Sequence, residues 1–145
     1  MNGTENPPTL AVGLQHQEHM TVAARHTVPE VDPTWAGFQD MPPVLATAMM
    51  IGFIEQTCIE ALRPYLQSDQ RTVGTHVDVS HVSATPIGMK VTAHVELIEV
   101  EGRSLLFLVS CHDEAGLICE GRHRRALIDL TRFMKRLADK TARPL

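Results

Sequence analysis

The stretch "IGFIEQTCIEAL", residues 51–62, is the most apolar helical pattern in the chain, and it contains one acid in an unexpected place. Apolar residues on nearly all sides of this pattern predict a helix that its surroundings bury over most of its surface. On a helical projection, Glu55 falls about 100° away from the polar face that Gln56, Glu60 and Arg63 define. It therefore points into apolar surroundings or at a boundary, where a carboxylate is costly unless it is paired or reached by water.

Prolines on either side set the expected ends of this helix. Pro42 and Pro43 suit a first helical turn, where the missing N–H of proline costs nothing, so we expect the helix to begin near residue 43. Pro64 should end it at about Leu62.

Length and composition are those of a single soluble domain. The chain has 145 residues, of which 43% are hydrophobic and 21% charged. Its net charge of −4 gives no general attraction to nucleic acid or to an anionic membrane. A membrane span over residues 44–62 is disfavoured, because a charge such as that of Glu55 costs about 2.5–3.5 kcal/mol at the centre of a bilayer. We therefore expect no nucleic-acid partner and no membrane association.

The cysteines and the first residues indicate a cytoplasmic protein. Cys58, Cys111 and Cys119 show no CxxC spacing, and an odd number of such cysteines predicts free thiols in a reducing compartment. No basic segment followed by an apolar run opens the chain, so no signal peptide is expected. Residues 1–12 are polar and proline-rich, which predicts a flexible segment before one domain over residues 13–145.

The rest of the chain reads mainly as strands. Two short strand-like pieces precede the long helix, at 15–22 and 26–31. Four strand-like segments follow it, at 72–83, 88–102, 103–116 and 116–129. An amphipathic helix is expected after them, at 130–142. Short links between these four predict an antiparallel meander, because a parallel crossover needs a dozen or more residues. Together these patterns predict an α+β fold, in which a curved antiparallel sheet wraps around one long central helix.

The strand at 72–83 adds a second inward titratable group. Its odd positions, among them Val73, Val77 and Val79, form the apolar row that should face the core, and this row ends in His81. A single histidine on an apolar face is more often structural than catalytic. With Glu55 also pointing inward, however, the two groups could divide acid and base roles.

Thr47 is the third polar candidate, because it lies early in the long helix. Free backbone N–H groups and the positive end of the helix dipole favour a developing oxyanion there. The alternative is a hydroxyl bonded back to its own helix. If Thr47, Glu55 and His81 converge at one crevice beside the helix start, they suit acyl transfer to water. The alternative for Glu55 is a boundary residue bonded to a strand side chain.

Two other features leave alternatives open. The loop at 32–43 contains Trp35, Phe38 and Met41, which could tuck under it as a satellite core or form a lid over a pocket. The run "GRHRRALI", residues 121–128, could be a solvated edge or could bind the phosphates of a nucleotide-bearing substrate. No HExxH or comparable ligand spacing occurs, so neither a metal site nor a cofactor is expected.

Three segments together resemble one known family. They are "LATAMMIGFIEQTCIEALRPYL", "GTHVDVSHVSATPIGMKVTAHVELIEVEGR" and "GRHRRALI". In this order they resemble the fluoroacetyl-CoA thioesterase-like family of hot-dog-fold enzymes, from about Gly13 to Phe133. The Thr-x7-Glu spacing and the histidine before "SATPIG" are the most specific parts. The resemblance implies a hot-dog fold, a homodimer, and hydrolysis of acyl-coenzyme A thioesters without a metal or other cofactor.

The resemblance also implies roles for individual residues. Thr47, Glu55 and His81 match the family's catalytic residues, with Glu55 as nucleophile or as base for water. Gly74 matches a glycine that leaves space for the acyl carbonyl, and Arg125 matches an arginine near the substrate.

One position departs from the family pattern. Where the family's fluoroacetyl enzymes have two phenylalanines gating the acyl pocket, this chain keeps Phe38 and has Met41 at the other position. Methionine is flexible, so we expect another short acyl group. Two alternatives to hydrolysis are a hot-dog hydratase or dehydratase and a non-catalytic acyl-CoA-binding module.

Overall fold

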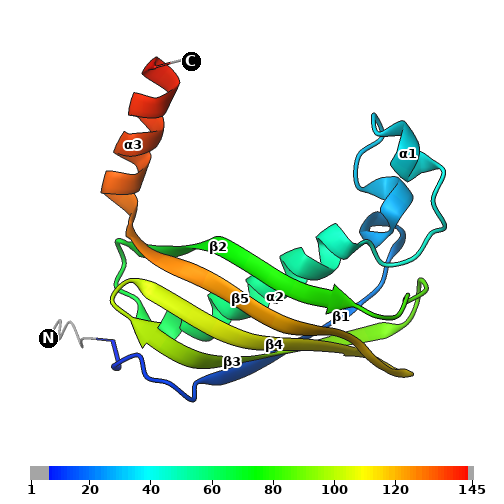
Figure 1. Cartoon of the computed structure of the whole chain (residues 1–145), viewed down its shortest axis with the longest axis horizontal. Helices are drawn as coiled ribbons and strands as arrows, with labels where there is room; N and C mark the ends of the chain where they lie inside the picture. The colour runs from blue at the N-terminus through cyan, green and yellow to red at the C-terminus, as the bar shows by residue number, and fades with distance from the viewer. Residues whose placement is uncertain (1–6, 144–145) are drawn as a thin grey trace, which may run out of the picture.

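A five-stranded antiparallel sheet and one long helix organise the computed structural model, which describes residues 7–143 (Figure 1). The strand order across the sheet is β1-β3-β4-β5-β2. The strands are β1 (Gln15–Thr21), β2 (Gln70–His81), β3 (Lys90–Glu101), β4 (Ser104–Asp113) and β5 (Gly116–Asp129), and the α-helices are α1 (Ala36–Gln39), α2 (Thr47–Leu62) and α3 (Leu130–Ala142). The predicted α+β class is therefore confirmed.

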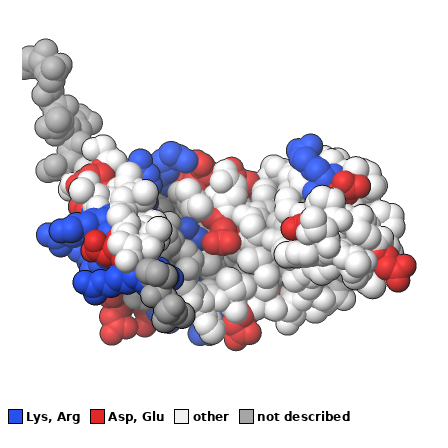
Figure 2. Space-filling model, turned by 90° about the horizontal axis from the view of Figure 1, so that it is seen from above, with Lys and Arg blue, Asp and Glu red and all other residues white. Residues whose placement is uncertain are grey.

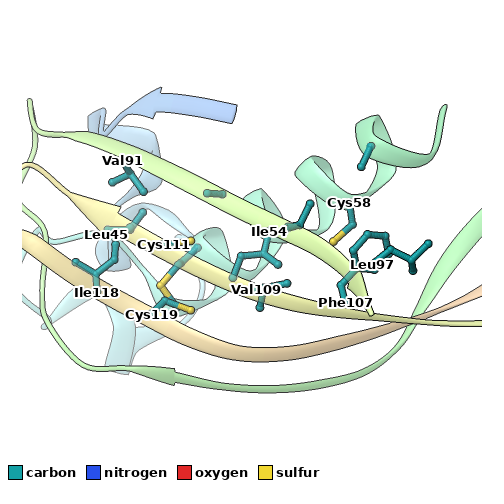
Figure 3. Close-up of a cluster of buried hydrophobic side chains, with 14 of the residues drawn as sticks. Leu45, Ile54, Cys58, Val91, Leu97, Phe107, Val109, Cys111, Ile118 and Cys119 are labelled. Atoms are coloured by element: carbon teal, nitrogen blue, oxygen red, sulfur yellow. The ribbon is translucent and has the colours of Figure 1, made fainter. Parts of the chain in front are cut away.

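The core lies between α2 and one face of the sheet (Figure 3). The helix contributes residues three and four positions apart, namely Met50, Ile54, Cys58 and Ala61. The sheet contributes every second residue of its central strands: Val91, Ala93, Val95 and Leu97 from β3, and Leu105, Phe107, Val109 and Cys111 from β4. Full burial of one such large side chain stabilises the fold by about 1.5–3 kcal/mol, so this layer supplies most of the driving force for folding.

The long helix begins at Thr47, and its predicted start near residue 43 is wrong. The residues before it are extended, because their backbone groups bond to other segments. Leu45 N–H donates to the carbonyl of Thr85 at 2.9 Å, and Ala46 N–H donates to the carbonyl of His26 at 2.9 Å. In a helix starting at Pro43 the Ala46 N–H would instead donate to the carbonyl of Pro42. The predicted end at Leu62 is confirmed, and a 3₁₀ turn containing Pro64 follows it.

The first strand of the predicted meander has a different neighbour from the one expected. β3, β4 and β5 form consecutive hairpins, but β2 pairs with β5 at the edge of the sheet and not with β3. Residues 82–89, between β2 and β3, bond to other segments: Val82 N–H donates to Ile118, and Gly88 N–H donates to Val22. The link therefore crosses the end of the sheet, although its length suggested a simple turn.

A β-bulge between Gly74 and His76 reverses the alternation of β2. Gly74 pairs with Arg125 and Val77 pairs with His123, and both of these β5 side chains are buried on the inner face. The inner row of β2 therefore runs through the even position 74 before the bulge and through odd positions after it. The predicted odd inner face is correct for residues 77–81 and wrong for 73 and 75.

The segments before α2 also differ from expectation. Residues 24–30 contain two 3₁₀ turns, Ala24–His26 and Val28–Glu30, so the strand expected at 26–31 is not found. In the following loop, Trp35 is 50% exposed and Met41 is 46% exposed, so the predicted satellite core is wrong for these two residues in the described chain. The expected flexible segment 1–12 lies partly outside the described residues, and Leu10 within it packs against the core.

The C-terminal helix α3 has the predicted bounds. Asp129 caps it, because its side chain accepts a hydrogen bond from the N–H of Arg132. No helix within residues 7–143 has the length and apolar character needed to cross a membrane.

We predict that Gly121→Ala strongly destabilises the pairing of β5 with β2. Gly121 has φ of +155°, and an added Cβ would lie 2.1 Å from the carbonyl oxygen of Asp78 and 2.7 Å from Cα of Val79. Because both contacts are backbone, we expect a loss of about 2 kcal/mol or more in the free energy of unfolding, measured by urea denaturation.

The matched control is Gly37→Ala, since an added Cβ there meets nothing within 4 Å. It should change the free energy of unfolding by less than about 0.5 kcal/mol. Equal stability of the two variants would contradict the described pairing of Gly121.

Candidate functional site

Thr47 and His81 meet at the start of α2. Thr47 is the first residue of the helix, and His81 is the last residue of β2. Thr47 Oγ1 and His81 Nδ1 lie 2.8 Å apart, which is a hydrogen bond between side chains 34 positions apart in the sequence. The Thr47 hydroxyl is thus bonded to a histidine, and the alternative of a bond back to its own helix is not what the structure shows.

The N-terminus of α2 is open. Its N-cap residue is Ala46, which offers no side-chain acceptor to the first turn. The first helical hydrogen bond is donated by Met50 N–H to the carbonyl of Ala46, so the N–H groups of Thr47, Ala48 and Met49 have no such partner. These groups, together with the helix dipole, favour an anionic oxygen beside the Thr47 hydroxyl.

His81 is held in a partly desolvated position. Burial lowers the pKa of His81 below its ordinary value, because the charged imidazolium is disfavoured there. Its Nε2 atom is buried and has no hydrogen-bond partner among residues 7–143. The ring is therefore poised to be neutral near pH 7, with one nitrogen on Thr47 and the other available to a further group.

Glu55 contacts a side chain from β5. Its Oε2 accepts a hydrogen bond from Arg125 at 3.1 Å, and the Glu55 side chain is 38% exposed while that of Arg125 is 2% exposed. This contact agrees with the alternative interpretation of Glu55, in which it is a boundary residue bonded to a strand side chain. Among residues 7–143 no hydrogen bond reaches Glu55 Oε1, so one carboxylate oxygen remains free for another partner.

Arg125 is fully occupied by its neighbours. Its Nε donates to Thr72 Oγ1 at 2.9 Å, and one terminal nitrogen donates to the carbonyl of Thr72 at 2.9 Å. The other terminal nitrogen donates both to Glu55 and to His123. Arg125, which the family resemblance placed near the substrate, thus acts within this chain as a buried anchor for the Glu55 carboxylate.

His123 completes this cluster and escaped the sequence predictions. It is fully buried, its Nδ1–H donates to the carbonyl of His76 at 2.9 Å, and its Nε2 accepts from Arg125 at 3.1 Å. Burial lowers the pKa of His123 most strongly, and the charge of Arg125 lowers it further. One signal could have revealed it: His123 lies two positions before Arg125, so both side chains lie on the same face of one strand.

Gly74 leaves the space that the Glu55 carboxylate occupies. A Cβ added at Gly74 would lie 2.7 Å from Glu55 Oε2, 3.2 Å from Cε1 of His123 and 3.5 Å from a terminal nitrogen of Arg125. Any larger residue would displace the carboxylate from Arg125. Gly74 therefore belongs to the Glu55 cluster.

Within one chain the three predicted catalytic residues form two groups rather than one. Thr47 and His81 are bonded to each other, whereas Glu55 is bonded to Arg125. Thr47 and Glu55 lie on the same helix eight positions apart, a rise of about 12 Å. The expected convergence at a single crevice is therefore not found within one chain.

The two residues predicted to contact the acyl group lie in the loop before α2. Phe38 is half-buried and packs edge-on against Trp35, with ring centroids 5.1 Å apart, and Met41 is exposed. Both lie close in sequence to the helix start.

Comparison with known proteins yields one family. The family model described as fluoroacetyl-CoA-specific thioesterase matches residues 22–131. The fluoroacetyl-CoA thioesterase of Streptantibioticus cattleyicolor is 38% identical over 132 residues, which cover 91% of this chain and 95% of that protein.

Solved structures agree with this result. A structure of the fluoroacetyl-CoA thioesterase FlK superposes with a TM-score of 0.89 at 37% identity, covering 92% of this chain and 98% of that one. A hot-dog-like protein from Thermanaerovibrio acidaminovorans superposes with a TM-score of 0.76 at 21% identity, covering 97% of each chain, and supports the fold alone. The predicted hot-dog fold and the family resemblance are thereby confirmed, and this chain belongs to the fluoroacetyl-CoA-specific thioesterase family.

Proposed function

We propose that this protein is an acyl-CoA thioesterase that hydrolyses a short-chain acyl-coenzyme A to a carboxylic acid and free coenzyme A. The observation that carries the proposal is the hydrogen bond between Thr47 and His81 at the open N-terminus of α2. A hydroxyl, a neutral histidine and free backbone N–H groups are what the oxygen of a thioester needs as it becomes an oxyanion. A hydratase would bind the same oxygen but direct water to the β-carbon, and membership of the thioesterase family favours attack at the carbonyl carbon instead. A binding module would need no desolvated histidine.

The helix N-terminus binds the thioester oxygen in this proposal. The Thr47 hydroxyl and the free N–H groups of the first turn donate to it, and they stabilise it more strongly as negative charge develops. Loss of one such donor typically lowers kcat by about 10²–10³-fold.

Glu55 promotes cleavage of the carbon–sulfur bond by one of two routes. As nucleophile, its free oxygen attacks the carbonyl carbon, the bond to sulfur breaks, and coenzyme A leaves as a thiolate that takes up a proton. Water then cleaves the resulting mixed anhydride into the acid product and Glu55. As general base, Glu55 instead takes a proton from a water molecule that attacks the same carbon; the bond to sulfur then breaks, and the coenzyme A thiolate takes up a proton as it leaves. In both routes His81 moves protons or orients the water, and Arg125 holds Glu55 in place.

In this proposal a homodimer brings the Thr47–His81 pair and the Glu55–Arg125 cluster together. Thr47 and Glu55 of one chain are about 12 Å apart along α2, too far to act on one carbonyl carbon. β2 is a strand of twelve residues at the edge of the sheet, and a long unpaired edge favours pairing with another chain. If the β2 edges of two copies pair antiparallel, the His81 end of one strand lies opposite the Gly74 end of the other. Glu55 of one subunit then faces Thr47 and His81 of its partner.

Three further properties belong to this proposal. The domain comprises residues 13–145. Cys58, Cys111 and Cys119 are free thiols buried in the described chain, which supports a location in the reducing cytoplasm. Phe38 and Met41, just before the oxyanion site, border the acyl group, and the flexible Met41 side chain fits a short acyl chain other than a fluorinated one.

We predict release of free thiol from short acyl-coenzyme A substrates. A thiol assay over acetyl-, fluoroacetyl-, propionyl-, butyryl- and hexanoyl-CoA should show the highest kcat/KM for one of the shorter non-fluorinated chains. The hydratase alternative is tested with crotonyl-CoA, by measuring the decrease in the absorbance of its conjugated double bond. Loss of that absorbance without thiol release, or binding without either change, would reject the thioesterase.

Glu55→Gln and His81→Ala should each lower kcat by about 10²-fold or more, the usual size of acid–base contributions. Glutamine keeps an oxygen that can accept from Arg125, so the fold of the first variant should persist, as near-parental thermal melting would verify. Near-full turnover by both variants would contradict the assignment.

Mixing the two inactive variants tests whether the site is shared. If each site combines Glu55 of one subunit with His81 of the other, subunit exchange should restore about a quarter of the parental activity, because half of the dimers are mixed and each mixed dimer has one intact site. A site contained within one chain would give no restoration.

The pH dependence of kcat/KM should follow His81. Because burial places the pKa of His81 below its ordinary value, the ring is neutral above about pH 6.5 and gains a proton only as the pH falls below that. We therefore expect full kcat/KM at pH 7–8 and a decline on the acid side that is absent in His81→Asn. A decline that persists in that variant would assign the titration to another group.

A further inference from the structure

The C-terminal helix α3 presents an apolar face that nothing in the described chain covers. Its apolar side chains recur three and four positions apart, and Met134 is 55% exposed and Leu137 is 42% exposed. None of its described residues is buried, and Figure 1 shows the helix standing away from the sheet after β5. A thirteen-residue helix gains little stability by itself, so this face is expected to pack against another surface.

A groove runs between this helix and the body of the molecule. It has a volume of about 740 Å³, and Phe133 and Met134 of α3 line one wall. Ile59, Leu66 and Thr72 are among the residues of the other wall. Since Thr72 binds Arg125, the groove lies beside the cluster that holds Glu55.

A second exposed apolar surface lies on the loop before α2. We call residues 32–43 the lid segment. Trp35 is 50% exposed and Met41 is 46% exposed, and Trp35 packs edge-on against Phe38. Aromatic and methionine side chains of this kind are enriched where protein surfaces meet.

The charges of the two surfaces are complementary. The only acid of α3 is Asp139, and its basic residues are Arg132, Lys135, Arg136 and Lys140. The lid segment contains Asp32 and Asp40, and no lysine or arginine occurs between residues 26 and 62. Seen from above in Figure 2, Lys and Arg gather at the end that carries α3, whereas the opposite end is mostly uncharged. Arg25, seven positions before the lid segment, is the nearest basic residue in sequence.

The two surfaces belong to opposite ends of β2. α3 follows Asp129, which pairs with Gln70 at the start of β2. The lid segment precedes Thr47, which is bonded to His81 at the end of β2. A strand of this length spans about 35 Å, so the two surfaces do not meet within one chain. Antiparallel pairing of two β2 edges places the start of one strand at the end of the other.

We propose that α3 of each subunit packs its apolar face onto the lid segment of the partner subunit and thereby closes the acyl pocket from outside. This inference rests on the homodimer of the proposed function and goes further, because it assigns the C-terminal helix to the wall of the neighbouring site. The lid segment of the partner fills the groove beside Glu55, and its acidic residues face the basic side of α3.

Cross-linking tests the contact directly. The variant Gly37→Cys/Leu137→Cys places one thiol on α1 of the lid segment, where an added Cβ meets nothing within 4 Å, and one on α3. The native cysteines are buried, so a short bismaleimide should join the introduced thiols between chains and give a covalent dimer on a denaturing gel. The control Gly37→Cys/Leu108→Cys carries its second thiol on the outer face of β4, at a residue 48% exposed, and should stay largely monomeric on the gel.

Two substitutions on α3 separate the apolar contact from a general effect of the helix. Adding Met134→Gln to the cross-linking variant should lower the yield of covalent dimer about fivefold or more, because a polar side chain replaces an apolar one in the contact. Adding Asp139→Gln, on the opposite face of α3, should leave the yield within about twofold. In the chain without introduced cysteines, Met134→Gln/Leu137→Gln should lower kcat/KM for the preferred acyl-CoA about tenfold, and Asp139→Gln should not.

The outcomes distinguish this inference from the proposed function. A chain that sediments as a dimer and releases thiol from acyl-CoA, but shows no cross-link between positions 37 and 137, overturns the role of α3 and leaves the thioesterase intact. A chain that sediments as a monomer and releases no thiol overturns both. Equal cross-linking of the Leu108→Cys control also overturns the proposal, because it would reveal contact without specificity.

Discussion

The guanidinium of Arg125 lies buried on the inner face of β5, and this buried charge constrains the surrounding structure. A buried cation is tolerated only if its hydrogen bonds are satisfied and an opposite charge is close. Thr72 satisfies two of its donors, and Glu55 and His123 share a third nitrogen. The carboxylate that looked misplaced in an apolar helix is therefore the counter-ion of this charge, and it keeps one oxygen free.

Meeting these requirements shapes β2. The strand must present Thr72 and the bare backbone of Gly74 to the inner side, and it must also end with His81 on that side. Strict alternation cannot do this, because 74 is even and 81 is odd. The bulge between Gly74 and His76 supplies the one-residue shift that reconciles the two. One irregularity thus allows the Arg125 cluster and the Thr47–His81 pair to lie on the same face of one strand.

Much of the fold and of the candidate site follows from local pattern. Glu55 stands out because it breaks an apolar helical repeat, and Thr47 because it lies near the start of the same helix. Predictions that needed a long-range partner were less successful. The short link after β2 suggested a hairpin with β3, but its backbone bonds to distant segments and lets β2 pair with β5. The prolines before α2 suggested an earlier start, but residues 44–46 bond to two other loops.

Residues a few positions apart were enough to predict the long helix and its end at Leu62, the four long strands after it, the C-terminal helix and the inward orientation of Glu55 and His81. The start of the helix at Thr47 and the contacts of Thr47 with His81 and of Glu55 with Arg125, 70 positions away, depend instead on the tertiary structure. Such pairings depend on which strand edges meet and where a bulge shifts the register. Those choices are made by the packing of the whole sheet on α2, and no short stretch of sequence contains them.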